Sequence, residues 1–134
     1  MTKIKFFADS NCDIPLDIAR AEGIEILPFT ITIDGVEYQE AYSFTSAEYY
    51  KKLIGCREMP VTAQIPPSAF AGKFAEAYSA GYTCAVVTTM TSVGSGTYSS
   101  AGIGKGLFYE EHPEAVDKFE IYIFDSGNYS ISYG

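Results

Sequence analysis

The residues best suited to chemistry lie in one hydroxyl-rich stretch, 88–101, between a strand-like run at 84–87 and a predicted helix. The stretch holds serines, threonines and two glycines, but no charged side chain. At the carboxyl end of a strand, such hydroxyls and the first N–H groups of a helix form a common ligand site. A Ser/Gly turn that only caps a helix needs no ligand. The stretch alone leaves both interpretations open.

The surrounding pattern predicts an α/β fold. Apolar runs predict four strands, at 4–8, 24–28, 84–89 and 119–124. Helical spacing predicts helices at 67–80 and 95–109, and a shorter helix capped by Asp13 with Pro15 in its first turn and Ile14, Ile18 and Ala21 on one face. This order is typical of a mainly parallel central sheet with helices on both faces.

A short insertion interrupts that alternation. Asp34-Gly35 between two β-forming runs, 29–33 and 36–39, predicts a hairpin. Thr45 and Glu48 form a capping box that opens a further helix. The proline-containing segment 55–67 is predicted to be a loop.

Several loops are expected at one edge of the sheet. Asp9-Ser10 follows the first strand, 91–96 follows the third, and Asp125-Ser126 follows the last. The loop 60–67 is placed to fold over them. Because carboxyl ends of parallel strands meet at one edge, this convergence favours a site over simple caps.

Composition limits the partners and the compartment. The chain has 134 residues, enough for one domain with a core, and a net charge of −8. No basic patch is available for phosphates, which argues against nucleic acid. Three widely spaced cysteines predict reduced thiols in a cytoplasmic protein. The N-terminus lacks the pattern of a signal peptide, and no apolar run is long enough to span a bilayer.

The sequence bears on two classes of enzyme. A serine hydrolase is disfavoured because neither Ser92 nor Ser95 lies in Gly-x-Ser-x-Gly and the lone histidine, His112, follows a helix. The pattern of a phosphate-binding loop is also missing, and loops 60–68 and 88–101 contain no Lys or Arg. A metal- or phosphate-dependent enzyme built on Asp9, Asp125 and the Ser/Gly loop 91–97 stays as the alternative.

A monoanionic ligand with an apolar body fits these loops better. Hydroxyls and backbone N–H groups can hold one carboxylate without a salt bridge if its buried oxygens are bonded. The apolar part then supplies affinity, at roughly 0.8 kcal/mol per buried CH₂.

Four motifs in this chain resemble the DegV family. They are the opening strand with Asp9-Ser10-Asn-Cys-Asp13-Ile-Pro15, the loop Pro60-Val-Thr62-Ala-Gln64, the run Thr91-Ser92-Val-Gly94-Ser95-Gly96-Thr97-Tyr98, and Asp125-Ser126. The resemblance covers the whole chain with the motifs in the family's order.

This resemblance implies a fatty-acid-binding protein that is not itself an enzyme. It implies that Thr62 and Ser92 hold the carboxylate of a long-chain fatty acid. Supporting positions are expected at Ser10, Gln64, Gly94, Ser95, Gly96 and Ser126. The implied ligand is the fatty acid alone, without metal or cofactor, and the implied partner is a fatty acid kinase, with transient membrane contact.

The resemblance also implies the domain organisation. Residues 1–134 correspond to the N-terminal α/β domain, and family members carry a second, lipid-enclosing domain that this chain lacks. A third possibility is an interaction fragment without ligand, which exposes apolar surface where another domain docks.

Overall fold

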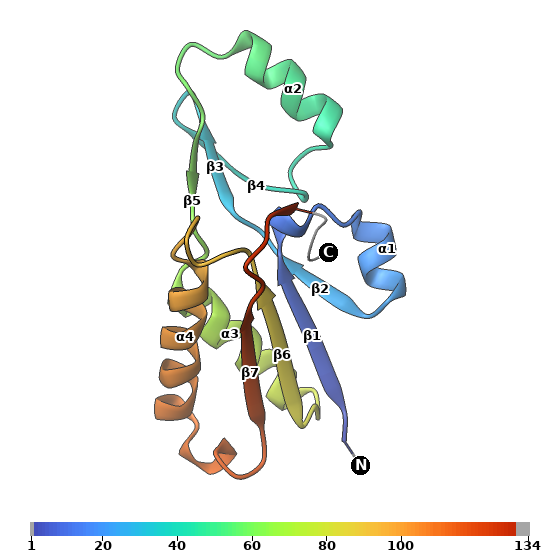
Figure 1. Ribbon diagram of the computed structural model, residues 1–134, viewed down its shortest axis with the longest axis vertical. Coiled ribbons are helices and arrows are strands. Elements are labelled where there is room, and N and C mark those ends of the chain that lie inside the picture. The colour runs from blue at the N-terminus through green and yellow to red at the C-terminus, as the bar shows by residue number, and fades with distance from the viewer. Residues whose placement is uncertain (1, 131–134) are drawn as a thin grey trace.

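A parallel sheet forms the centre of the molecule. The computed structural model describes residues 2–130, apart from the side chain of Ser46 (Figure 1). The sheet has the order β2-β1-β6-β7, and all three pairings are parallel. Its strands are β1 (Ile4–Asp9), β2 (Ile24–Leu27), β6 (Cys84–Thr89) and β7 (Glu120–Asp125). All four predicted strands are confirmed.

Helices cover both faces of this sheet, which confirms the predicted fold class. Because side chains alternate along a strand, Phe7 and Ala8 point to opposite faces. Phe7 belongs to the main core, beneath α3 (Pro67–Ser79) and α4 (Thr97–Glu111). Ala8 packs instead with Ala19 of α1 (Leu16–Ala21). A short 3₁₀ helix, η2 (Pro113–Ala115), links α4 to β7. We call these elements, with the turn η1 (Ser10–Cys12), the body.

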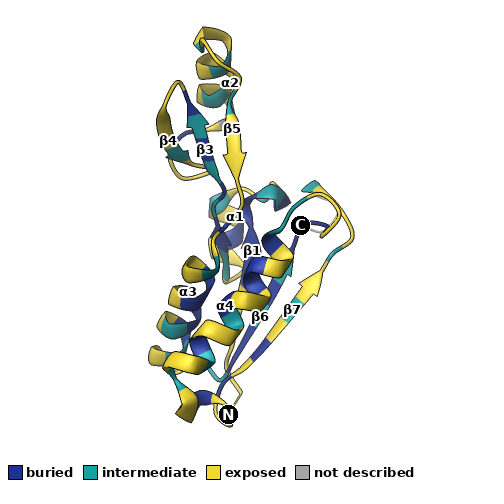
Figure 2. Cartoon of the chain, turned by 90° about the vertical axis from the view of Figure 1, so that its left-hand side faces the viewer, coloured by how far each residue is buried: buried dark blue, intermediate teal, exposed yellow. Residues whose placement is uncertain are grey.

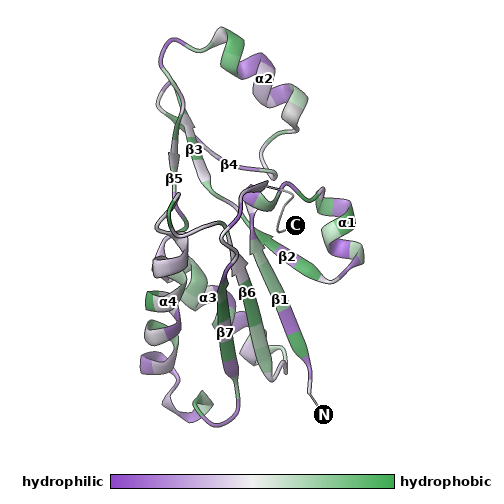
Figure 3. Ribbon diagram, in the orientation of Figure 1, coloured by the Kyte–Doolittle hydropathy of each residue, from purple (hydrophilic) through white to green (hydrophobic). Residues whose placement is uncertain are grey.

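The buried positions lie mainly in the body. Figure 2 shows them along the strands and on α3 and α4, while the upper part of the molecule is mostly exposed. The body strands are also among the most hydrophobic segments (Figure 3). Away from α1, however, the second face of the sheet leaves apolar side chains exposed: Ile4, Phe6, Tyr122 and Phe124.

The start of α1 differs from the prediction. Asp13 does not cap the helix: it adopts a left-handed conformation with φ of 56° at the end of η1, and the helix begins after Pro15 without a side-chain cap. The predicted apolar face is also wrong, because Ile18 is exposed and Ala19 is the buried residue. Asp13 instead closes η1, where its backbone N–H donates to Ser10 O.

The insertion forms a separate lobe. It contains β3 (Thr30–Ile33), β4 (Val36–Gln39), α2 (Ser46–Gly55) and β5 (Val61–Ala63). The predicted hairpin and capping box are confirmed: Asp34 and Gly35 both have positive φ, and Thr45 and Glu48 exchange hydrogen bonds. The strand β5 lies within the predicted loop and pairs antiparallel with β3. The lobe has its own core, formed by Ile31, Ile33 and Phe44.

Candidate functional site

Two aspartates hold the loops together at the carboxyl edge of the sheet. Asp9 is buried, and its carboxylate accepts the backbone N–H of Met90 at 2.8 Å and that of Asn11 at 3.2 Å. Asp125 accepts the N–H groups of Ser92 at 3.1 Å and Gly127 at 3.0 Å. The predicted convergence of these loops is therefore confirmed.

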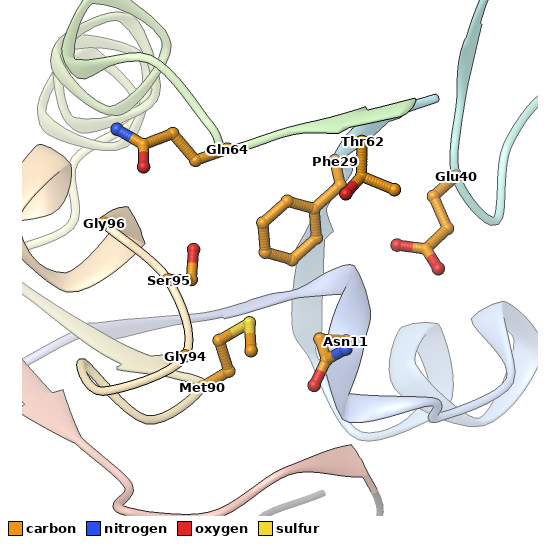
Figure 4. Close-up of a pocket in the computed structure, with 9 residues that line it drawn as sticks. All are labelled: Asn11, Phe29, Glu40, Thr62, Gln64, Met90, Gly94, Ser95 and Gly96. Atoms are coloured by element: carbon orange, nitrogen blue, oxygen red, sulfur yellow. The ribbon is translucent and has the colours of Figure 1, made fainter. Parts of the chain in front are cut away.

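These loops and the base of the lobe enclose a cavity of about 440 Å³, which we call the edge cavity (Figure 4). Its wall comes from η1, from the lobe and from the loop after β6. The lining residues are Asn11, Phe29, Glu40, Thr62, Gln64, Met90, Gly94, Ser95 and Gly96. None of them is a lysine, arginine or histidine.

Five residues predicted for the site line this cavity: Thr62, Gln64, Gly94, Ser95 and Gly96. Three others do not. The Ser10 hydroxyl donates to the Glu40 carboxylate. The Ser126 hydroxyl exchanges hydrogen bonds with the backbone of Asn128. Ser92 is exposed, and its backbone N–H donates to Asp125. Ser95, rather than Ser92, therefore lines the edge cavity together with Thr62. The carboxylate role of Thr62 and Ser92 stays a prediction.

The hydroxyl of Ser95 is held by the start of α4. Its Oγ accepts the N–H of Thr97 at 3.2 Å and lies 2.9 Å from Thr97 Oγ1, where either oxygen can donate. When Thr97 donates, the Ser95 proton is free for a ligand. On the next turn, Gln64 Nε2 donates to Ser100 Oγ at 3.1 Å. A Cβ at Gly96 would overlap the Gln64 amide, so glycine allows this close approach.

Among the residues that the structure describes, Glu40 is the one charged member of the cavity wall, and the sequence did not indicate it, nor the other lining residues Asn11, Phe29 and Met90. Its backbone N–H donates to Phe29 O at 2.9 Å, which fixes it beside the cavity. Ser10 Oγ donates to Glu40 Oε2 at 2.5 Å and accepts the N–H of Phe29 at 2.9 Å. Burial raises the pKa of Glu40, the hydrogen bond from Ser10 opposes this, and the negative charges of Asp13 and Asp9 add to the increase.

A second cavity adjoins the first. This lobe cavity, of about 700 Å³, lies between the lobe and α1 and shares Glu40 and Thr62 with the edge cavity. Much of its remaining wall is apolar, including Ile14, Leu16, Ile26, Ile31, Phe44 and Tyr49.

The alternative metal-dependent site finds little support in the geometry. Asp9 and Asp125 each accept two backbone N–H groups, as loop-closing aspartates do. Across residues 2–130, no group of three or more His, Cys, Asp or Glu side chains is arranged to hold a metal ion.

Asp125 should make the loop contacts depend on pH. Its pKa is lowered by the hydrogen bond from the Ser92 side chain and then by that from the Gly127 N–H. A lowered pKa means that its contribution to stability is present above the ordinary value of 3.8 and is lost as the pH falls through the folded-state pKa. We therefore expect the urea midpoint of the chain to fall more steeply on acidification than that of Asp125→Asn. Parallel curves for the two proteins would contradict this role.

None of the helices described in the structure has the length and apolar character needed to cross a bilayer.

Comparison with known proteins gives the family. The model of the DegV family, described as an uncharacterised protein family, matches residues 3–134. A DegV domain-containing protein of Caldanaerobacter subterraneus subsp. tengcongensis is 36% identical over 135 residues, covering 100% of this chain and 44% of the relative.

Solved structures show the same fold. The stearic acid-binding protein of Eubacterium ventriosum aligns with a TM-score of 0.82 at 25% identity, covering 97% of this chain and 43% of that one. The fatty acid kinase (Fak) B3 protein of Streptococcus pneumoniae, loaded with linoleic acid, aligns with a TM-score of 0.76 at 20% identity, covering 96% and 43%. The chain spans less than half the length of these relatives. By its family match and these likenesses, the chain belongs to the DegV family.

Proposed function

We propose that this chain binds a long-chain fatty acid whose carboxylate lies in the edge cavity, between the hydroxyls of Thr62 and Ser95. The observation that carries this proposal is the wall itself: hydroxyl and amide groups from lobe and body face one cavity without a cation. Such donors suit a single carboxylate, whereas a phosphate dianion normally recruits Lys or Arg. The fatty acids bound by the related structures support the same ligand class.

The acyl chain extends toward the lobe cavity. The two cavities share Glu40 and Thr62, so a head group beside Thr62 lies at the entrance of the larger one. Its volume of about 700 Å³ is ordinary for a small-molecule site. Each methylene buried against its apolar wall would add roughly 0.8 kcal/mol before entropy costs.

A second domain and a kinase partner complete the proposed setting of this chain. Residues 1–134 act as an N-terminal domain, with the acyl chain enclosed further by a second domain of the kind implied by the length of the relatives. The protein presents its fatty acid to a fatty acid kinase in the cytoplasm and does not catalyse the reaction itself. The likeness to the Fak B3 protein supports the kinase as partner.

Linoleic acid binding by the purified chain tests the ligand class. Native mass spectrometry should show one fatty acid per chain, either carried from expression or after addition of linoleic acid. A chain that neither co-purifies with fatty acid nor binds linoleic acid in direct titration would contradict the proposal.

Alanine variants test the head-group contacts. Thr62→Ala and Ser95→Ala should each weaken linoleic acid binding about tenfold or more, since a hydrogen bond to a charged group is worth about 1.5–3 kcal/mol. Ser99→Ala, which removes an exposed hydroxyl of α4 outside the cavity, is the matched control and should bind as the parent does. Ser92→Ala separates the two candidate donors: a larger loss for Ser92→Ala than for Ser95→Ala would move the head group to the residue predicted by the resemblance.

A further inference from the structure

Glu40 places a carboxyl group inside the proposed head-group site, so the following inference rests on the proposed function. Figure 4 shows its side chain pointing into the space between Thr62 and Asn11. The hydrogen bonds of Ser10 fix one oxygen of the Glu40 carboxyl group, Oε2. Because Ser10 Oγ accepts the N–H of Phe29, its own proton is directed at Glu40 Oε2. The second oxygen, Oε1, is the one left to meet a ligand.

No positive group in the wall offsets this acid. The charged groups that act on Glu40 are Asp13 at the end of η1 and Asp9 at the end of β1, and both are negative. Asp17 of α1, which lines the lobe cavity with Glu40, is also an acid. The lobe contributes the neutral Thr62 and Gln64 to the wall, and the loop after β6 contributes Met90 and Ser95. A fatty acid carboxylate placed here therefore faces a second carboxylate in a partly buried space. Two such groups cannot both stay ionised at close range and instead share a proton.

We propose that Glu40 binds the head group as a protonated acid: when the ligand binds, Glu40 takes up one proton from solvent and donates it, as an Oε1–H···O hydrogen bond, to the ionised carboxylate of the fatty acid. The chain gains one anion and one proton, so the complex has the same net charge as the free chain. Burial raises the pKa of Glu40, which lowers the free-energy cost of adding this proton when the ligand binds. Ser10 keeps the carboxyl group oriented by donating to Oε2.

Calorimetry measures this proton directly. Linoleic acid, kept below its micellar concentration, is titrated into the chain at about pH 7.5, where a monomeric carboxylic acid is ionised. Two buffers with different ionisation enthalpies then give the number of protons taken up per ligand. We expect about one for the parent chain and close to zero for Glu40→Gln, whose amide keeps a donor at the same place. The Kd of the parent should rise by up to about tenfold per pH unit once Glu40 ionises in the free chain, while that of Glu40→Gln stays flat.

Glu37→Gln is the matched control, because Glu37 is an exposed glutamate of β4, the strand that Glu40 directly follows, and lies outside the cavity. It should take up as many protons as the parent. Binding by the parent without proton uptake would overturn the role of Glu40 and leave the proposed function standing. Proton uptake that persists in Glu40→Gln would assign the proton to another group. No binding by the parent in either buffer would overturn both proposals. If Glu40→Gln does not fold, the proton count of the parent alone decides.

Discussion

Replacing Gly104 with alanine should lower the free energy of unfolding by about 1–3 kcal/mol, the usual cost of an added methyl group in a closely packed interface. Gly104 is buried where α4 crosses α3. A Cβ at this position would lie 2.6 Å from Phe70 Cβ and 2.7 Å from the backbone oxygen of Pro67. Because one of these atoms belongs to the backbone, the helices themselves must move apart. Urea denaturation of the two proteins measures the difference.

Gly106→Ala on the same helix should have the opposite effect. Its Cβ would meet no atom within 4 Å, and alanine in a helix is more stable than glycine by roughly 0.5–1 kcal/mol. The two variants carry the same substitution two residues apart, so helix propensity is common to both. Equal urea midpoints for the two variants would show that the close approach of α3 and α4 does not cause a loss of stability in Gly104→Ala.

The second large effect is expected for Asp9→Ala, which should cost about 3 kcal/mol. Its carboxylate is fully buried and accepts two backbone N–H groups, and hydrogen bonds to a charged acceptor contribute about 1.5–3 kcal/mol each. Loss of the contact to Met90 leaves a buried N–H without this acceptor and releases the loop that carries Ser95. Thermal unfolding followed by circular dichroism should show the loss, and linoleic acid should bind more weakly to the folded fraction.

Asp125→Ala provides the comparison, because it removes the same kind of contact at the end of β7 but at an exposed position. Its loss of stability should be much smaller, since water can replace the missing acceptor. Similar losses for both variants would mean that burial is not what makes the Asp9 contact strong.

Local chemistry explains why much of this fold could be predicted. The hairpin at Asp34-Gly35 needs positive φ at both residues, and the capping box at Thr45 and Glu48 needs only residues three apart. The body strands are short apolar runs, and their carboxyl ends meet because parallel pairing requires it. The approach of the Asp9, Thr91 and Asp125 loops followed from this topology.

What could not be predicted depends on contacts between distant segments. β5 has three exposed residues and no periodic pattern, and it becomes a strand only because β3 lies beside it. In the loop after β6, Ser95 lines the cavity and Ser92 does not. The Ser92 N–H instead binds Asp125, which lies more than thirty residues later in the chain. Glu40 looks like an ordinary solvated charge in an acidic chain. Only the pairing of its N–H with Phe29 brings it to the cavity.

The separate core of the lobe has a mechanical consequence. The lobe joins the body through two short connections, at 28–29 and 64–66, and Tyr42 also donates to Ile26 O of the body at 2.6 Å. A change in the angle between the two parts would leave the core of Ile31, Ile33 and Phe44 intact. Because Thr62 belongs to β5 of the lobe and Ser95 lies just before α4 of the body, such a change would widen or narrow the space between them. A molecule gripped from both sides would hold the two parts at one angle. Binding of such a molecule and the orientation of the lobe would then be thermodynamically linked, so a partner that fixed the lobe orientation would also change the affinity for the ligand.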